Sequence, residues 1–202
     1  MGETVRGNML CFVSSNASKL EEIKKLFASH HLQVVCVKHK VNEIQCLNMQ
    51  DIIVDKVKKA FLQLKRPVFV EQTGLYIEDF GGLPGGLTEI MWDTLGPEKF
   101  CDFFGNRENV NAKAVTVVGY CDGKMVKSYE KTMKGRIAPK PEGNRGYQWD
   151  CIFIPDGEHE TVAILQEKKA CGSIRQRALE AFLLDYVENT QNIGGGEAER
   201  FD

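Results

Sequence analysis

The chain has 202 residues, of which 43% are hydrophobic and 27% charged, and its formal net charge is -2. This composition is typical of a globular protein with a sizeable core, and the charge excludes a general electrostatic attraction to nucleic acid or membranes. Apolar runs fall short of the roughly 20 residues of a spanning helix, and residues 1–8 lack a hydrophobic signal segment. We therefore expect a cytoplasmic protein that binds neither membranes nor nucleic acid.

The cysteines and histidines give no sign of a metal site. The seven cysteines are widely spread and form no C-x-x-C pair, and the four histidines have no metal-ligand spacing. A disulfide framework or a zinc site would need closer spacing. Reduced, mostly buried thiols are expected.

Strand and helix patterns alternate in the first third of the chain. Residues 9–14 form a continuous apolar run, typical of a strand buried on both faces, and residues 32–37 predict a second strand. An apolar stripe between them predicts an amphipathic helix. A second helix is expected to begin at Asp51 and to end before Pro67.

The middle of the chain contains a short apolar stretch and a glycine-rich segment. Residues 68–70 predict a short strand that runs into a polar turn at 71–74. Residues 81–86 contain four glycines and one proline, which indicates a tight loop of specific shape. Residues 88–94 and 97–104 have helical patterns.

The last part of the chain predicts a hairpin and a final helix. Residues 112–120 and 125–133 alternate like two antiparallel arms, and residues 149–154 form another apolar segment. The final helix is expected over residues 173–188. We predict a flexible N-terminus at 1–8, a single domain at 9–188 and a disordered tail at 189–202.

A strand, a polar turn and a helix start place Ser14, Asn16 and Lys19 where an anion can bind. Backbone N–H groups and the positive end of the helix dipole attract anions, and Lys19 adds a full charge. The same arrangement with a lysine also occurs without a ligand. Similarly Asp51, which precedes Lys56 on the second helix, is either a helix cap or a metal ligand.

Position 72 carries a neutral amide where a carboxylate is expected. A strand that leads into a polar turn commonly delivers a carboxylate to a phosphate-handling cleft, but Gln72 is the last polar residue before Thr73-Gly74. An amide cannot accept a proton at neutral pH and carries no charge. Glu71 is expected to point to the opposite face, because consecutive strand residues alternate.

An aromatic residue beside an acid, Trp149-Asp150, suits a purine ligand. The ring can stack on the base while the carboxylate reads the base edge. The alternative is that Trp149 belongs to the core and that Asp150 caps a turn. Lys169 and the segment Ser173-Ile174-Arg175 follow downstream.

Taken together, the order and spacing of these motifs resemble those of the inosine triphosphate pyrophosphatases over residues 9–188. The resemblance implies an α/β fold with a long twisted mixed sheet flanked by helices, two lobes with a nucleotide cleft between them, and a homodimer. It also implies a Mg²⁺-assisted attack of water on a deaminated purine nucleoside triphosphate, which releases the monophosphate and pyrophosphate. The motifs that carry it are Asn16-x-x-Lys19, Asp51, Glu71-x-Thr73-Gly74-Leu75, Gly81-Gly82-Leu83-Pro84-Gly85, Gly135-x-Ile137, Trp149-Asp150-x-x-Phe153-x-Pro155-Asp156-Gly157, Lys169 and Ser173-x-Arg175-x-x-Ala178-Leu179.

The resemblance also implies roles for particular residues. Asp51 would take the place of the metal-binding glutamate of the family, and Gln72 stands at the position of its catalytic aspartate, with Glu71 beside it. Asn16 and Lys19 would hold the triphosphate, with Lys56 nearby. The full nucleotide-binding set that we predict is Ser14, Asn16, Lys19, Lys56, Thr73, Gly74, Trp149, Asp150, Lys169, Ser173 and Arg175.

Two departures from the family pattern weaken the case for hydrolysis. Loss of general-base help at Gln72 costs roughly 10²–10⁴-fold in rate, and Ile174 replaces the histidine of the Ser-His-Arg motif with a side chain that cannot form hydrogen bonds. We therefore hypothesise a catalytically impaired sensor of dITP, ITP or XTP that acts with a partner effector in stress or antiviral defence. The alternatives are an active pyrophosphohydrolase that uses Glu71, Asp51 or another metal arrangement, and a homologue retained only as an interaction surface.

Overall fold

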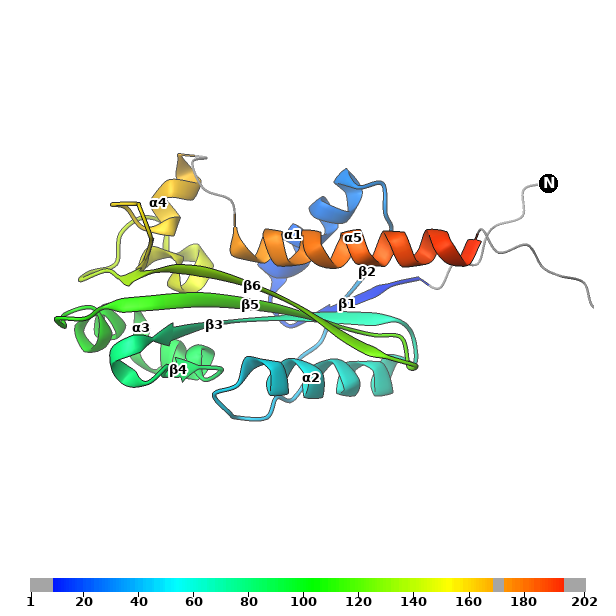
Figure 1. Ribbon diagram of the computed structural model, residues 1–202, viewed down its shortest axis with the longest axis horizontal. Coiled ribbons are helices and arrows are strands. Elements are labelled where there is room, and N and C mark those ends of the chain that lie inside the picture. Colours follow the sequence, from blue (N-terminus) through cyan, green and yellow to red (C-terminus); the bar gives the residue numbers. More distant parts are fainter. Residues whose placement is uncertain (1–8, 169–172, 195–202) are drawn as a thin grey trace, which may run out of the picture.

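The protein is elongated and is built on one twisted sheet that runs along its length (Figure 1). It is seen in a computed structural model that describes residues 9–168 and 173–194, without the side chains of residues 146–148 and 189–194. The strand order is β2-β1-β3-β5-β6-β7, and β4 pairs with β3. The seven strands are β1 (Cys11–Ser14), β2 (Val35–Lys38), β3 (Val68–Ile77), β4 (Pro84–Gly85), β5 (Asn111–Cys121), β6 (Val126–Ile137) and β7 (Phe153–Pro155).

The sheet is mixed, because β1 is parallel to both β2 and β3 while the other pairs are antiparallel. Helices α1 and α5 cover one face and α2 covers the other (Figure 1). The helices are α1 (Ala17–Ser29), α2 (Met49–Leu64), α3 (Thr88–Phe104), α4 (Val162–Glu167) and α5 (Ile174–Gly194), with short 3-10 helices η1 (Glu78–Phe80) and η2 (Arg145–Cys151).

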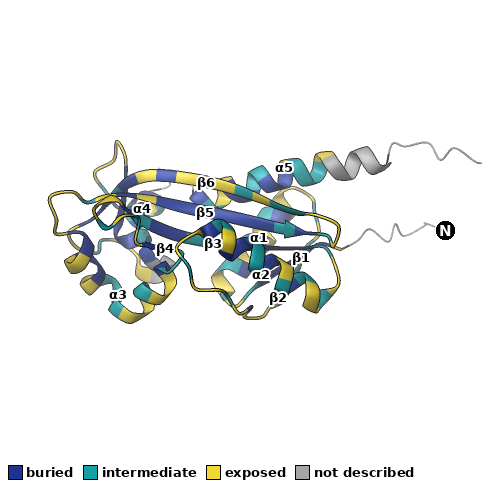
Figure 2. Ribbon diagram, turned by 60° about the horizontal axis from the view of Figure 1, so that its bottom comes forward, coloured by how far each residue is buried: buried dark blue, intermediate teal, exposed yellow. Residues whose placement is uncertain are grey.

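Three apolar clusters hold these layers together, and Figure 2 shows the buried strands β3 and β5 beside the more exposed strand β6. One lies between the sheet and α2, and one fills the end of the molecule around α3 and η2. The third joins β3 to α1 and α5 through Phe69, whose ring centroid lies 5.5 Å from that of Phe27 and 4.9 Å from that of Phe182. This cluster fixes α1 and α5 relative to β3.

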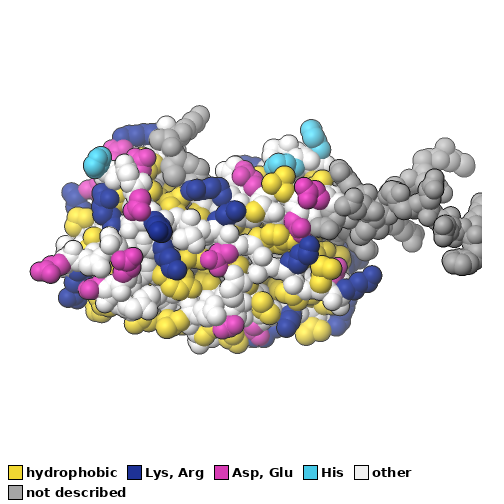
Figure 3. Space-filling view, viewed as in Figure 1, with side chains coloured by type: hydrophobic (Ala, Val, Ile, Leu, Met, Phe, Trp, Pro, Cys, Tyr) yellow, Lys and Arg dark blue, Asp and Glu magenta, His cyan; other side chains and the backbone are white. Residues whose placement is uncertain are grey.

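The surface is of mixed charge. On the face seen in Figure 3, basic and acidic side chains are interspersed, in agreement with the formal net charge of -2. Within the described residues, no helix is both long and apolar enough to cross a membrane.

The main difference from the sequence-based expectation is the length of β3. A short strand with a polar turn at residues 71–74 was expected, but β3 continues through Ile77 and pairs with β5 from Val68↔Cys121 to Ile77↔Ala112. Cross-strand pairing over ten residues overrides the local turn signal of Thr73-Gly74. Gln72 therefore lies in the middle of a strand.

Smaller differences concern several other elements. The segment 81–86 contains the two-residue strand β4 within the predicted glycine loop, and residues 149–151 belong to η2, with β7 following. The last helix was expected to end at Glu188, but α5 continues to Gly194. The predicted helices at 88–94 and 97–104 join in α3, with a break at Gly96, where φ is 70°.

We expect Phe69→Ala to lower the free energy of unfolding by about 3–5 kcal/mol, because it opens a cavity where α1, β3 and α5 meet. The side chain is 0% exposed and touches rings from three other elements of that cluster. Chemical denaturation measures the effect. The matched control is Leu184→Ala on α5, which is 67% exposed and should change stability by less than about 0.5 kcal/mol. Equal effects of the two changes would contradict this packing.

Candidate functional site

The start of α1 forms one wall of the candidate site. Ser14 ends β1, and its Oγ accepts a hydrogen bond from the backbone N–H of Asn16 at 3.1 Å. Asn16 is the N-cap of α1, because its Oδ1 accepts from the backbone N–H of Lys19 at 3.2 Å. The capping oxygen is occupied, but the amide of an asparagine side chain still offers two N–H donors. This turn can therefore present donors to an anion.

A polar pocket of about 340 Å³ opens beside this turn. It lies at the carboxyl ends of β1 and β2, where ligands commonly bind in open α/β sheets. Its cationic side chains are those of Lys19, Lys40 and Lys56. The other lining residues are Val13, Ser14, Ser15, Asn16, His39, Val41, Asn42, Glu43, Gln45, Gln72, Gly86, Glu89, Ile90 and Asp93.

Gln72 faces this pocket and contacts Lys56 of α2. The Oε1 atom of Gln72 accepts a hydrogen bond from the Nζ atom of Lys56 at 2.8 Å. The same ammonium forms an ion pair with Glu43 at 2.6 Å and donates to the backbone carbonyl of Glu71 at 3.3 Å. An amide oxygen and one carboxylate oxygen thus meet a single positive charge in the pocket wall.

The structure places Glu43, and not Asp51, beside Lys56 and Gln72. Asp51 is exposed in the first turn of α2 and is not among the pocket-lining residues. The structure therefore does not bring Asp51 together with Lys56 and Gln72 in this pocket, and its role as a metal ligand remains a prediction. A carboxylate at a helix start is stabilised by the helix dipole, which accounts for Asp51. Glu43 lies in the irregular segment between β2 and α2, which carries no motif.

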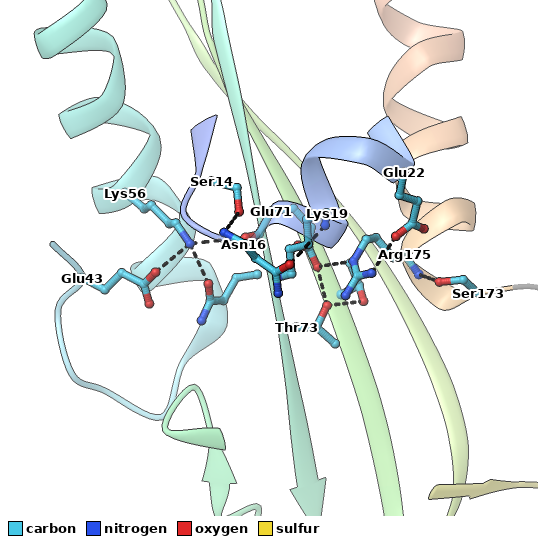
Figure 4. A network of polar contacts seen from close by, with 12 residues as sticks. Ser14, Asn16, Lys19, Glu22, Glu43, Lys56, Glu71, Thr73, Ser173 and Arg175 are labelled. Atoms are coloured by element: carbon cyan, nitrogen blue, oxygen red, sulfur yellow. Dashed lines mark hydrogen bonds and ion pairs between the residues drawn. The ribbon is translucent and has the colours of Figure 1, made fainter. Parts of the chain in front are cut away.

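Glu71 takes part in a separate, buried ion network on the opposite face of β3 (Figure 4). Its side chain is 0% exposed, and its Oε2 atom lies 2.7 Å from Nζ of Lys19. Its Oε1 atom lies 3.2 Å from Nε of Arg175, which also pairs with Glu22 at 2.8 Å. Lys19 and Glu22 come from α1 and Arg175 from α5, whereas the Lys56 that binds Gln72 comes from α2. The expected alternation of Glu71 and Gln72 is confirmed.

The cations determine the charge state of Glu71. Burial alone would raise the pKa of this carboxyl, but Lys19 and Arg175 outweigh it and hold the pKa well below the ordinary value of 4.5. Burial lowers the pKa of Lys19, and Glu71 opposes that effect. Glu71 is thus a fully ionised structural partner, which makes it a poor proton acceptor for an attacking water.

Thr73 supports the network, Gly74 lets β4 approach β3, and both residues lie outside the pocket lining. The Oγ1 atom of Thr73 donates to Glu71 Oε1 at 2.5 Å and lies 2.8 Å from Oγ1 of Thr116. A Cβ atom added to Gly74 would lie 2.5 Å from the carbonyl oxygen of Gly85, so only glycine lets β4 approach β3 here. Their predicted contact with a nucleotide remains a prediction.

The structure places the predicted base-binding residues Trp149 and Asp150 in different surroundings: Trp149 lies in the core, whereas Asp150 has a polar partner. Trp149 is only 5% exposed and packs in a T-shaped contact with Phe153, so its ring belongs to the core and does not offer a stacking face. Asp150 accepts a hydrogen bond from Gln166 at 3.1 Å. Lys169 lies outside the described residues.

The start of α5 positions Arg175. Ser173 Oγ accepts a hydrogen bond from the backbone N–H of Arg175 at 3.2 Å, while Ile174 is 6% exposed and packs in the core around α3 and η2. Burial raises the pKa of Asp150 to about 6, against the opposing effects of Arg175 and of the Gln166 hydrogen bond. Arg175 thus acts electrostatically on Asp150, and neither residue belongs to the pocket lining.

Among the described residues, no group of three His, Cys, Asp or Glu side chains is arranged to hold a metal ion. Glu43 and Gln72 nevertheless present oxygens to one cation, the Lys56 ammonium. Mg²⁺ is commonly held by one or two carboxylates together with phosphate and water oxygens. The oxygen chemistry of this wall therefore fits Mg²⁺ when phosphates supply the remaining ligands.

The fold and the pocket define the class of protein: an α/β protein with a polar pocket of mixed charge at the carboxyl ends of parallel strands. Comparison with known proteins then gives the family. The family model described as "Ham1 family" matches residues 10–184, and the chain belongs to this family.

Relatives match over most of their length. A dITP/XTP pyrophosphatase of Methanopyrus kandleri is 34% identical over 180 residues, covering 88% of this chain and 96% of the relative. An inosine triphosphate pyrophosphatase of Kluyveromyces lactis is 32% identical over 189 residues, covering 90% and 96%. The resemblance inferred from the motifs is confirmed.

Solved structures confirm the fold class. A HAM1 protein of Coxiella burnetii superposes with a TM-score of 0.74 at 22% identity, covering 89% of this chain and 99% of that chain. The Ham1 protein of Staphylococcus aureus gives a TM-score of 0.72 at 24% identity, covering 90% and 99%. The expected mixed sheet flanked by helices is thus correct.

The buried network makes a prediction about acid titration. A carboxylate held by two cations should keep its charge as the pH falls well below 4.5, the ordinary value for glutamate. The ¹³Cδ chemical shift of Glu71, followed by NMR from pH 7 downward, should therefore stay in the ionised range at pH values where exposed glutamates have begun to titrate. A midpoint at or above 4.5 would show that Lys19 and Arg175 do not pair with Glu71 in solution.

Proposed function

We propose that this protein binds deaminated purine nucleoside triphosphates, dITP, ITP or XTP, and hydrolyses them slowly or not at all. The pocket supports the binding part of the proposal. Donors at the start of α1, together with Lys19 and Lys56, suit a triphosphate, since helix N-termini and ammonium groups both attract phosphate oxygens. Relatives with 32–34% identity are named for dITP, XTP and inosine triphosphate.

Asp150 and Arg175 suit the base. A 6-oxopurine has an N–H donor at ring position 1 and an oxygen at position 6, which match an ionised carboxylate and a guanidinium. Adenine reverses both groups, because its position 1 accepts and its 6-amino group donates. A site that hydrogen-bonds one pattern rejects the other strongly, since its buried polar groups would be left unpaired. Contacts of Lys169 and Ser173 with the base remain part of this proposal.

Mg²⁺ is the proposed cofactor. Glu43 would hold it together with phosphate oxygens, and the Gln72 amide offers a neutral oxygen in the same wall. Bound there, the ion would neutralise phosphate charge and polarise the phosphoryl oxygens. The chain's own contribution is to place Lys56 between Glu43 and Gln72, where this ammonium can move to a phosphate.

The neutral side chain at position 72 is the observation that carries the proposal of weak hydrolysis. Gln72 faces the pocket and accepts a hydrogen bond from Lys56, and it cannot take a proton from water. Glu71 cannot replace it, because its carboxylate is engaged on the other face of β3. Binding without turnover suits a nucleotide sensor, so we propose that a partner effector, in stress or antiviral defence, responds to the bound state.

A homodimer is also proposed, and light scattering would test it.

The second candidate function is an active pyrophosphohydrolase. Two observations favour it: the relatives are named pyrophosphatases, and Glu43 supplies a carboxylate to the same pocket. The two candidates differ in one measurable quantity, the rate of pyrophosphate release from bound dITP in the presence of Mg²⁺.

We expect Gln72→Asp to raise the rate of pyrophosphate release from dITP by roughly 10²–10⁴-fold, the usual contribution of a general base. A coupled pyrophosphate assay with dITP, ITP, XTP, dGTP and ATP, combined with calorimetry, measures rate and affinity together. Gln45→Asp is the matched control, because it adds the same charge to another pocket-lining glutamine and should give no gain.

The outcomes separate the candidates. Binding of dITP by the unaltered protein without turnover supports the sensor, whereas turnover of about 1–10³ s⁻¹, the usual enzyme range, establishes the pyrophosphohydrolase. Absence of both binding and turnover would leave only an interaction role. Failure of Gln72→Asp to gain activity would mean that Ile174 or the metal geometry limits the reaction independently.

Recognition of the base should depend on pH through Asp150. The pKa of this carboxyl is about 6, and only the ionised form accepts the N–H of a 6-oxopurine. The affinity for dITP should therefore rise as the pH increases through 6, and Asp150→Asn should remove this rise. Calorimetric titrations between pH 5 and 8 test it, with His39→Asn, a change to another polar residue of the pocket lining, as the control that should leave the rise in place. An unchanged pH profile in Asp150→Asn would exclude Asp150 from base recognition.

A further inference from the structure

We infer that Glu71 is a positioning residue: as the shared buried counter-ion of Lys19 and Arg175, it fixes the cation at the phosphate end and the cation at the base end in one arrangement. The inference rests on the proposed function, which assigns those two ends. It gives Glu71 a role other than catalysis.

The contacts of Glu71 carry the argument. Each carboxylate oxygen faces a different cation, Oε2 at 2.7 Å from Lys19 and Oε1 at 3.2 Å from Arg175. The three side chains come from α1, β3 and α5, elements that lie far apart in the sequence and meet here (Figure 4). Lys19 also lines the pocket, so it has Glu71 on one side and the ligand space on the other.

Burial makes the Glu71 carboxylate difficult to replace as the counter-ion of Lys19. The side chain of Glu71 is 0% exposed, and those of Lys19 and Arg175 are 14% and 17% exposed. Water screens charges at such depth weakly, so removal of the central charge leaves Lys19 without its counter-ion and Arg175 with Glu22 as its remaining one. Within the described residues, Oε2 has no hydrogen bond of good geometry beyond its ion pair, so Thr73, which donates to Oε1, cannot take over this contact.

Glu71 also keeps Lys19 charged. Burial, Arg175 and Lys56 all lower the pKa of Lys19, and Glu71 is the group that raises it. The other charged groups around the network are Glu22, which pairs with Arg175, and Asp150, on which Arg175 acts electrostatically. Neither contacts Lys19 directly, so without Glu71 the ammonium should lose its proton at lower pH and bind phosphate less well.

A shared counter-ion couples the two ends of the nucleotide. When phosphate binds Lys19, the Lys19 contact of Glu71 is weakened or reoriented, and the carboxylate becomes a stronger partner for Arg175. Ordering at one end thereby changes the arrangement at the other end. A ligand that has only the phosphates, or only the base, occupies one end and gains none of this coupling.

The test is calorimetry of Glu71→Gln with dITP at pH 7, and with inorganic tripolyphosphate, which probes the phosphate end alone, at pH 7 and 9. We expect the affinity for dITP to fall about tenfold or more, because Lys19 and Arg175 lose the charge-assisted contacts with Glu71 that hold them in place. The affinity of Glu71→Gln for tripolyphosphate, relative to that of the unaltered protein, should fall further at pH 9 than at pH 7. Glu71→Asp should retain the unaltered pH profile, and Glu21→Gln, on the exposed side of α1, should change neither affinity.

Unchanged affinity and pH profile in a folded Glu71→Gln protein would overturn the inference. If the unaltered protein binds neither dITP nor tripolyphosphate, the proposed function is wrong. This outcome is distinguishable because it is measured on the unaltered protein. Thermal unfolding shows whether Glu71→Gln is folded.

If Glu71→Gln does not fold, a double-mutant cycle of Lys19→Met and Arg175→Met keeps the inference testable. Because Lys19 and Arg175 share Glu71, the loss of dITP affinity in the double variant should differ from the product of the two single losses by about fivefold or more. Losses that multiply would overturn the coupling.

Discussion

A carboxylate with no exposed surface must be compensated, and the compensation of Glu71 organises this end of the molecule. Lys19 of α1 and Arg175 of α5 meet it from two helices. Removal of one partner from a buried ion pair typically costs about 3–5 kcal/mol, so the two helices are not free to move independently. Phe69, two residues earlier on β3, packs against rings of the same two helices. Apolar packing and charge compensation thus fix the same arrangement.

Local sequence patterns predicted most of the secondary structure, because β1, α1, α2, the hairpin of β5 and β6, and α5 each carry a strong periodicity. They failed where partners distant in the sequence decide the outcome. The turn signal of Thr73-Gly74 gave way to pairing with β5 along the whole of β3. Trp149 could equally have been a stacking platform or a core residue, and its burial in a cluster with distant residues such as Leu75 and Phe100 makes it core. Neither result follows from residues near in the sequence.

The candidate site was predictable to a similar degree. The strand–turn–helix start identified Ser14, Asn16 and Lys19, and all three line the pocket together with Lys56 and Gln72. Glu43 was missed, because it lies in a segment without periodicity, whereas Asp51 occupied a recognisable helix start. A usable signal did exist. Glu43 follows the carboxyl end of β2, and segments at the carboxyl ends of neighbouring parallel strands border the same crevice.

The lysines of the pocket have a consequence for the kind of ligand that can enter. Both Lys19 and Lys56 already have carboxylate partners, Glu71 and Glu43 respectively. Under the proposed function, a phosphate that binds there competes with Glu43 for Lys56, whereas Glu71 stays on the buried side of Lys19. A ligand with several phosphates can contact both lysines at once, whereas a small ion such as chloride contacts one of them. The two carboxylates thus favour a polyphosphate over a simple anion.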